Sequence, residues 1–319
     1  MATARTQELH SLAERIANEL PPVVEEVVLT GSVSRGAADE VSDIEMLLVT
    51  TEQLELAECF EHARRIGFER LDTWGPQGTE TNRVFGYVEG VPVETIWWSR
   101  DFAEAAVARM VSGEPSGSAE ALANGVALRT VGLLEDWQER LRVYPDDLVA
   151  ARVEDAALTW GGFHASGMLT LARPGDRLQL LERLLDDCLR VLQIVYALNR
   201  VWPPTTKRLA ERVRELHVKP DRLAERIEEV LTEPDPLRAM IALGELQLDT
   251  LALAPSGPNV DRARRWVSEG LEILREALAR PAAPPEAGGE AACYAHVLCP
   301  DCGVVLDGGP HRPGCPSAG

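Results

Sequence analysis

Two acidic residues lie two positions apart, shortly after a Gly-Ser turn near the start of the chain. The turn is Gly31-Ser32, and the acids are Asp43 and Glu45. In an extended strand, side chains at positions i and i+2 project from the same face, so both carboxylates could bind one divalent metal ion. Magnesium is held by one or two carboxylates plus substrate phosphates, and a Gly-Ser turn offers those phosphates backbone N–H groups and a hydroxyl. The pattern therefore predicts a phosphate-and-metal site.

A third acid, Glu94, lies in the strand-like run 91–98 among apolar and aromatic neighbours. The order of Gly-Ser turn, Asp-x-Glu pair and later strand acid resembles the nucleotidyltransferase superfamily. Three segments are similar to aminoglycoside nucleotidyltransferases of the kanamycin type: the Gly-Ser-x-x-Arg turn that ends at Arg35, the Ser-Asp-Ile-Glu-Met core that begins at Ser42, and the Val-Glu strand. The resemblance covers residues 27–98.

This resemblance implies magnesium-dependent transfer of a nucleoside monophosphate, AMP from ATP or the same group from another nucleoside triphosphate, to a hydroxyl with release of pyrophosphate. Asp43 and Glu45 would hold two magnesium ions, and Glu94 would complete the second metal site or take the acceptor's proton. Gly31 and Ser32 would bind the phosphates, while Arg35 assists them or only covers the loop. The implied acceptor is a hydroxylated small molecule such as an aminoglycoside-like antibiotic, which would make the protein an antibiotic-resistance enzyme.

Other interpretations stay open at this point. A Gly-Ser turn alone is usually only a turn, and Ser-Asp-x-Glu is often the cap of a helix. Within the same superfamily, the chain could instead modify a partner protein, as transferases of the antitoxin kind do, or bind nucleotide without transferring it. The extra helical half argues against the first of these, and the three intact acids argue against the second.

Lysine is rare in this chain, where only Lys207 and Lys219 occur. Lys207 follows Pro203-Pro204 at a position that resembles the helix-to-turn segment in the helical domain of several small-molecule nucleotidyltransferases. An ammonium there could reach the triphosphate as a compact point charge. The alternative is a solvated surface lysine after a Pro-Pro helix stop.

Apolar periodicity predicts the elements that position these residues. We expect a helix over 4–20 that Pro21-Pro22 ends, a hairpin turn at Glu89-Gly90, and a helix that Ser99 caps. Thr50 or Thr51 is expected to cap another helix, and Trp97 and Trp98 are expected to pack in the core. Strands are predicted over residues 26–30, 43–49, 68–73, 82–88 and 91–98.

Residues after about 100 have long Leu/Ala/Arg/Glu segments with helical spacing, which predicts a helical bundle. The predicted fold class is α/β (α+β): a small mixed-sheet nucleotidyltransferase domain at 1–100 and a helical acceptor-binding domain at 101–280. In the helical half, Glu154 and Asp155, near His164, are either a base that faces the site or ordinary surface acids, and the second is favoured.

The last part of the chain is rich in cysteine. A Pro/Ala/Gly-rich linker at 281–292 leads to a Cys/His-rich tail at 293–319, while Cys59 and Cys188 have helical apolar spacing and are expected to be buried. The tail pattern Cys-x2-Cys-x8-His-x3-Cys suits a structural zinc ion, a zinc knuckle, and its alternatives are a disordered tail or disulfides. The four candidate zinc ligands are Cys299, Cys302, His311 and Cys315.

Charge and length narrow the functional class. The chain has 319 residues and a formal net charge of −19, with 51 acidic against 32 basic residues. An acidic field repels nucleic-acid backbones, so we expect no nucleic-acid partner. No apolar run suggests a signal peptide or a membrane span, which predicts a cytoplasmic protein without a membrane partner. The sequence indicates nothing about the oligomeric state.

Overall fold

The computed structural model describes residues 3–74, 81–114, 116, 118–161, 175–204 and 207–279. The chain divides into two compact units, 1–275 and 276–319, and only residues 276–279 of the second are described. Within the described ranges, no helix combines the length and the apolar character needed to cross a bilayer.

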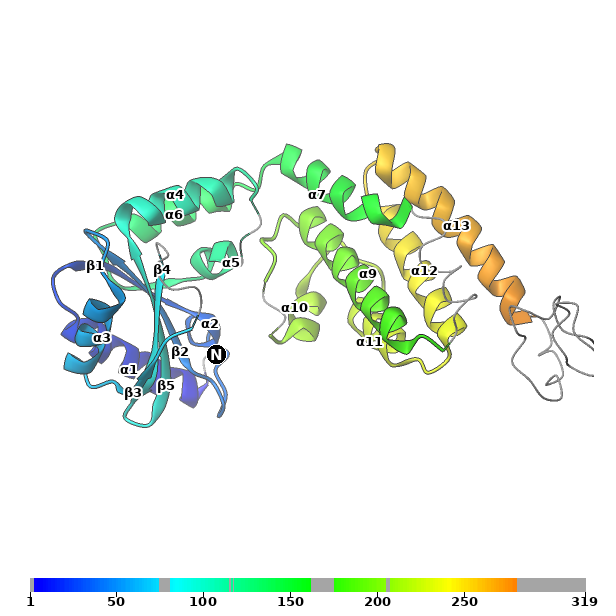
Figure 1. The fold of residues 1–319 in the computed structure, drawn as a ribbon. Helices are drawn as coiled ribbons and strands as arrows, with labels where there is room; N and C mark the ends of the chain where they lie inside the picture. The colour runs from blue at the N-terminus through cyan, green and yellow to red at the C-terminus, as the bar shows by residue number, and fades with distance from the viewer. Residues whose placement is uncertain are drawn as a thin grey trace, which may run out of the picture. The chain divides into compact units, whose positions relative to one another are not determined.

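The first half of unit 1 is built on a six-stranded mixed sheet (Figure 1). The strand order is β3-β4-β5-β2-β1-β6, and all neighbours are antiparallel except the central pair β2 and β5, which is parallel. The predicted mixed sheet and the Glu89-Gly90 hairpin are therefore confirmed. The strands are β1 (Val24–Thr30), β2 (Ile44–Thr50), β3 (Glu69–Asp72), β4 (Thr81–Val88), β5 (Val91–Ser99) and β6 (Val126–Arg129).

Helices cover both faces of this sheet, because its central strands are apolar on both sides. Helices α1 (Ala4–Glu19) and α3 (Leu56–Arg65) pack on the face that includes Trp97. Helices α4 (Arg100–Val111), α5 (Ser118–Ala123) and α6 (Leu133–Arg142) pack on the face that includes Trp98. Both tryptophans are buried, as predicted. Because they are successive residues of β5, Trp97 packs in the core on one face of the sheet and Trp98 in the core on the other.

The sheet half extends further along the chain than residue 100. Strand β6 pairs with β1 at one edge of the sheet, and α5 and α6 pack against the same face as α4. A boundary at residue 100 therefore divides a single sheet and its core. Helical segments begin at residue 100, as expected, but helices α4, α5 and α6 pack on the sheet and belong to the sheet half.

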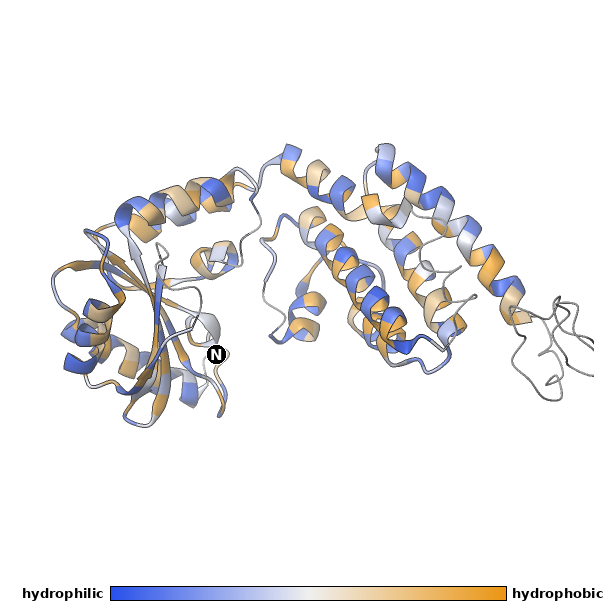
Figure 2. Cartoon of the chain, viewed as in Figure 1, coloured by the Kyte–Doolittle hydropathy of each residue, from blue (hydrophilic) through white to orange (hydrophobic). Residues whose placement is uncertain are grey.

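In the second half of unit 1, the described residues form helices and their connections and have their own core, as the predicted bundle requires. The helices carry alternating hydrophilic and hydrophobic bands (Figure 2), and their apolar sides meet around Leu184, Val191, Cys188, Leu243 and Leu246. The elements are α7 (Asp146–Leu158), the 3-10 helix η1 (Thr159–Gly161), α9 (Arg177–Leu198), α10 (Leu209–Glu215), α11 (Leu223–Thr232), α12 (Pro236–Leu253) and α13 (Pro258–Ala279).

Two helix starts test the predicted caps. Ser99 caps α4 as expected, since its hydroxyl accepts the backbone N–H of Phe102 at 3.2 Å. The expected Thr50 or Thr51 cap is wrong, because α3 begins later with a capping box between Glu55 and Glu58. Thr50 remains in β2, where its hydroxyl donates to the carbonyls of Glu52 and Trp98.

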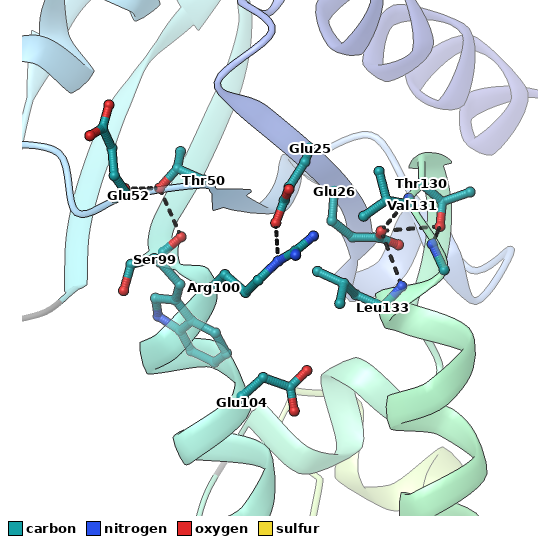
Figure 3. Close-up of polar contacts among 12 residues, drawn as sticks. Glu25, Glu26, Thr50, Glu52, Ser99, Arg100, Glu104, Thr130, Val131 and Leu133 are labelled. Carbon is teal, nitrogen blue, oxygen red and sulfur yellow. Dashed lines mark hydrogen bonds and ion pairs between the residues drawn. The ribbon is translucent and has the colours of Figure 1, made fainter.

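A buried acid fastens α6 to the sheet (Figure 3). Glu26 on β1 is fully buried, and its Oε2 accepts from the Thr130 hydroxyl at 3.1 Å and from the Val131 N–H at 2.8 Å. The same carboxylate accepts the N–H groups of Leu133 and Leu134, which are among the unpaired donors at the start of α6. A negative charge at a helix N-terminus is stabilising, so Glu26 caps α6 from a distant strand.

We expect Glu26→Gln to lower the free energy of unfolding by about 1–2 kcal/mol, because four charge-assisted hydrogen bonds lose their charge and one acceptor oxygen becomes a donor. Denaturant titration measures the loss. The neighbouring Glu25→Gln is the control, since it removes one ion pair to the exposed Arg100 and should cost no more than about 1 kcal/mol. Equal losses in the two variants would contradict the capping role of Glu26.

Asp187 on α9 is a carboxylic acid that is almost fully buried in the helical core. It accepts from Trp160 Nε1 at 3.1 Å and pairs with Arg183 at 3.3 Å. Burial raises the pKa of this carboxyl to about 6, against the lowering effect of Arg183. The folded protein therefore binds this proton more tightly than the unfolded chain does, and the contribution of Asp187 to stability is present below about pH 4 and is lost as the pH rises through 6.

Asp187→Asn should consequently raise the free energy of unfolding above pH 7 by about 1–2 kcal/mol. The amide keeps an oxygen that can accept from Trp160, and it avoids the cost of ionising a buried carboxyl. The loss of the attraction to Arg183 offsets part of this gain. The advantage should shrink between pH 6 and pH 4. Unfolding followed by tryptophan fluorescence at several pH values measures it, and a variant that is equally destabilised at every pH would contradict the sign.

Candidate functional site

The three predicted acids meet at one end of the sheet. Asp43 directly precedes β2, and Glu45 is the second residue of that strand. In the parallel register, Glu45 lies beside Glu94 on β5, and in the antiparallel register it lies beside Thr30 on β1. Strand alternation directs Asp43 and Glu45 to the same face. The Ser-Asp-x-Glu segment thus begins a strand, and the helix-cap interpretation is wrong.

The Gly-Ser turn lies against the middle acid of this group. Residues Gly31–Ser34 form a single helical turn, α2, that follows β1 directly. Gly31 has φ +72°, and a Cβ atom built on it would lie 2.2 Å from Glu45 Oε2. The position therefore requires glycine twice, for its backbone conformation and for the close approach of the carboxylate.

The loop between the turn and the acids is held from two sides. Asp39 accepts from the Ser42 hydroxyl at 2.8 Å and from the Val41 N–H at 3.2 Å, which closes the loop just before Asp43. At its other end, Ala38 exchanges hydrogen bonds with the hydroxyls of Thr3 and Thr6 at the start of α1. These contacts fix the conformation of the loop and so the position of Asp43 relative to Gly31.

Two cations from the helical half contact this loop and its acids. Lys207 Nζ lies 2.9 Å from Glu45 Oε1, and Arg208 forms an ion pair with Asp39. One of the two interpretations of Lys207 placed this residue at the phosphates. Its ammonium group contacts Glu45, which lies 162 residues earlier in the sequence. A role for Arg208 at this site was not predicted from the sequence, although Arg208 directly follows Lys207 after Pro203-Pro204 and could have been considered with it.

Arg35 takes part in a second charge cluster that the sequence did not reveal. Its guanidinium pairs with the buried Glu120 on α5 at 3.6 Å, and Arg212 on α10 pairs with the same carboxylate at 3.3 Å. Burial and the nearby Arg212 lower the pKa of Arg35. Glu120 therefore positions Arg35 beside the turn. A lone acid in the apolar stretch of α5 was the only sequence signal for it.

Burial and mutual repulsion make two of the acids, Asp43 and Glu94, harder to ionise than ordinary carboxyl groups. Burial raises the pKa of Asp43, and the negative charge of Glu45 adds to this effect. Burial also raises the pKa of Glu94, while Arg83, which pairs with it at 3.3 Å, opposes the shift. The hydrogen bond that Lys207 donates to Glu45 raises the pKa of the lysine. A cation placed among these carboxylates would relieve their mutual repulsion.

Asp43, Glu45 and Lys207 line a cavity of about 340 Å³, whereas Glu94 and Arg83 are not among its lining residues. A second cavity of about 350 Å³ shares Arg35 and Glu120 with it, and a third of about 510 Å³ shares Tyr196 with the second. The first cavity combines acids, cations and backbone donors, which is the composition that a metal-bound phosphate group requires. Its lining includes Gly31, Ser32, Arg35, Asp39, Ser42, Asp43, Glu45, Glu120, Lys207 and Arg208.

Magnesium fits this site by its donor chemistry. Within the described ranges, no three His, Cys, Asp or Glu side chains are gathered into a ready metal cage. Magnesium bound with a nucleotide does not require one, because it takes one or two carboxylates and completes its shell with phosphates and water. Asp43 and Glu45 supply such carboxylates on one strand face, and Glu94 lies beside them.

The remaining candidates lie elsewhere. Glu154 accepts the N–H groups of Asn259 and Val260 at the start of α13, and Asp155 accepts from Gln193. Cys59 and Cys188 are buried free thiols, as expected, and burial raises the pKa of both to about 12. His164 and the predicted zinc ligands, Cys299, Cys302, His311 and Cys315, lie outside the described residues, so the zinc knuckle stays a prediction.

Comparison with known proteins gives distant structural likenesses. No protein-family model matches the chain, and no curated protein matches it. A nucleotidyltransferase-like protein from Exiguobacterium sibiricum shares 11% sequence identity at a TM-score of 0.40, over 86% of this chain and 80% of that one. Cid1 in complex with its short product ApU shares 12% identity at a TM-score of 0.26, over 89% and 92%. Likenesses this distant do not assign an activity, and the functional argument rests on the site.

Proposed function

We propose that this protein transfers a nucleoside monophosphate, AMP from ATP in the first instance, to a hydroxyl of a small molecule and releases pyrophosphate. One observation carries the proposal. Glu45 lies against the Gly31 turn, beside Glu94 and within 2.9 Å of Lys207, so that acids, a phosphate-binding turn and a cation meet at one carboxylate. The aminoglycoside class is the first acceptor to test, since the local resemblance and the acidic charge of the chain favour it.

Asp43 and Glu45 would hold magnesium in this proposal, and Glu94 would either complete the set of metal ligands or take the acceptor proton. The metal would neutralise charge that develops on the transferred and departing phosphates. Gly31 and Ser32 would face the β and γ phosphates with backbone N–H groups and a hydroxyl. Arg35 and Lys207 would then supply positive charge on either side of those phosphates.

The chemistry is an in-line displacement at the α phosphorus. A bond forms between the acceptor hydroxyl oxygen and this phosphorus, and the bond to the bridging oxygen of the β phosphate breaks, so that pyrophosphate leaves with the electron pair. The acceptor proton passes to a carboxylate and then to water. Glu94 is the candidate base, since its raised pKa makes it a better proton acceptor than an ordinary carboxylate.

Pyrophosphate release from the purified protein tests the proposal. The assay combines magnesium, each nucleoside triphosphate in turn, and a panel of aminoglycosides, other hydroxylated antibiotics and a short oligonucleotide. Release that depends on a small-molecule acceptor and is lost in Asp43→Asn would support it. Release only with the oligonucleotide would move the acceptor class to nucleic acid. Nucleotide binding without release under any condition would favour the sensing or protein-modifying alternatives.

A further inference from the structure

One face of the outer strands β3, β4 and β5 carries exposed aromatic rings. Side chains at alternate positions of β4 share this face, namely Arg83, Phe85 and Tyr87. Trp74, which follows β3, is 55% exposed, and Tyr87 is 38% exposed. Contiguous exposed apolar groups on a protein surface can mark a binding site, whereas singly scattered ones need no explanation. We call Trp74, Arg83, Phe85 and Tyr87 the aromatic platform.

Two arginine guanidinium groups lie over rings of the platform and hold them in place. The Arg83 guanidinium lies 4.2 Å from the centre of the Trp74 ring, which in turn lies 5.9 Å from the ring of Phe85. Arg70 on β3 lies 5.6 Å from the centre of the Tyr87 ring. Cation–π contacts at these distances hold exposed rings in place and reduce the entropy that a ligand must remove on binding.

The platform is continuous with the proposed catalytic acids. Phe85 lies directly opposite Glu94 in the antiparallel register of β4 and β5, and Arg83 pairs with Glu94 at 3.3 Å. Glu45 separates Glu94 from Thr30 and the Gly31 turn in the sheet order. The platform and the Gly31 turn therefore lie on opposite sides of the acids in the sheet order. This arrangement suits an in-line transfer, in which the acceptor oxygen and the leaving pyrophosphate lie on opposite sides of the α phosphorus.

We propose that the aromatic platform stacks against one face of a ring of the acceptor alcohol, aromatic or sugar, and presents its hydroxyl to Glu94. The proposal rests on the function proposed above and narrows the acceptor to a ring-bearing molecule. Arg70 and Arg83 offset two of the three nearby acids, Glu69, Asp72 and Glu94, so little net charge remains and the platform selects mainly by stacking. A long polynucleotide would require further cations, since both arginines already lie over rings.

Probe binding without chemistry tests this proposal. Phenyl β-D-glucoside and kanamycin are titrated by ligand-observed NMR against Asp43→Asn protein and against the same protein with Trp74→Ala or Tyr87→Ala. Trp266→Ala on α13 is the matched control, because that partly exposed tryptophan also lies under an arginine, Arg262, but in the helical half. We expect Trp74→Ala to weaken binding of the phenyl glucoside at least about fivefold, with no change in Trp266→Ala.

Each outcome bears on the platform separately from the transfer. Equal affinity for the glucoside in Trp74→Ala and Trp266→Ala overturns the platform even if acceptor-dependent pyrophosphate release is found. Absence of glucoside binding to the parent protein, up to the solubility of the probe, also overturns it. Selective loss of binding in Trp74→Ala supports it even if no pyrophosphate is released, in which case only the proposed transfer fails.

Discussion

Asp43→Asn is expected to lower nucleotidyl transfer by at least about a thousandfold while the fold stays intact. Asp43 and Glu45 share one strand face, so the substitution removes one of two carboxylates that would hold magnesium on the triphosphate. A thousandfold loss corresponds to about 4 kcal/mol of transition-state stabilisation, a reasonable share for one ligand of the metal. The measurement is the initial rate of pyrophosphate release at saturating nucleotide.

The same variant should be at least as stable as the natural protein at neutral pH. Burial and the charge of Glu45 raise the pKa of Asp43, so the folded state binds its proton more tightly than the unfolded chain does. The stability that this carboxyl contributes is present at low pH and is lost as the pH rises through its raised pKa. An asparagine avoids that loss, and the difference in Tm between the two proteins should therefore disappear in acid.

Glu40→Gln is the matched control for Asp43→Asn. Glu40 lies in the same loop three residues earlier and is exposed, so its loss should leave both turnover and Tm unchanged. An unchanged rate in Asp43→Asn would refute the central assignment. A lowered Tm in that variant, with cooperative unfolding, would instead refute the electrostatic strain attributed to the acid group.

The secondary structure around the site was accessible from the sequence because its signals are local. Apolar runs identify β1 and β2, Glu89-Gly90 identifies a hairpin, and Ser99 identifies the start of α4. The three acids were found for the same reason, since Asp43 and Glu45 are two residues apart and Glu94 lies in a clear strand. Their adjacency then follows from the parallel pairing of β2 with β5.

The residues that the sequence did not reveal depend on long-range contacts. Strand β6 has four residues and no alternation of its own, and its pairing with β1 makes it a strand. Glu120, Arg83 and Arg208 each gain their place from a partner on another element. A propensity or a motif measures only neighbours along the chain, whereas these contacts depend on how the elements pack.

The Gly31 turn provides a test of geometry that removes no charged group. Gly31→Ala adds one methyl group whose carbon would lie 2.2 Å from Glu45 Oε2 and 3.0 Å from its carboxyl carbon. The carboxylate must move away from the turn, and with it the proposed metal position relative to the phosphates. Misplacement of a reacting group by about 1 Å can cost a hundredfold in rate, so we expect at least about that loss.

Gly90→Ala separates this displacement from backbone strain. Gly90 has φ +79°, close to the +72° of Gly31, but no atom lies within 4 Å of a Cβ built there. Both variants should lose about 1 kcal/mol of stability from the left-handed conformation, as denaturant titration would show. Only Gly31→Ala should also lose turnover, because only its methyl group meets Glu45. Equal activity in the two variants would mean that the turn does not set the position of this carboxylate, and the arrangement on which the proposed phosphate site depends would then be wrong.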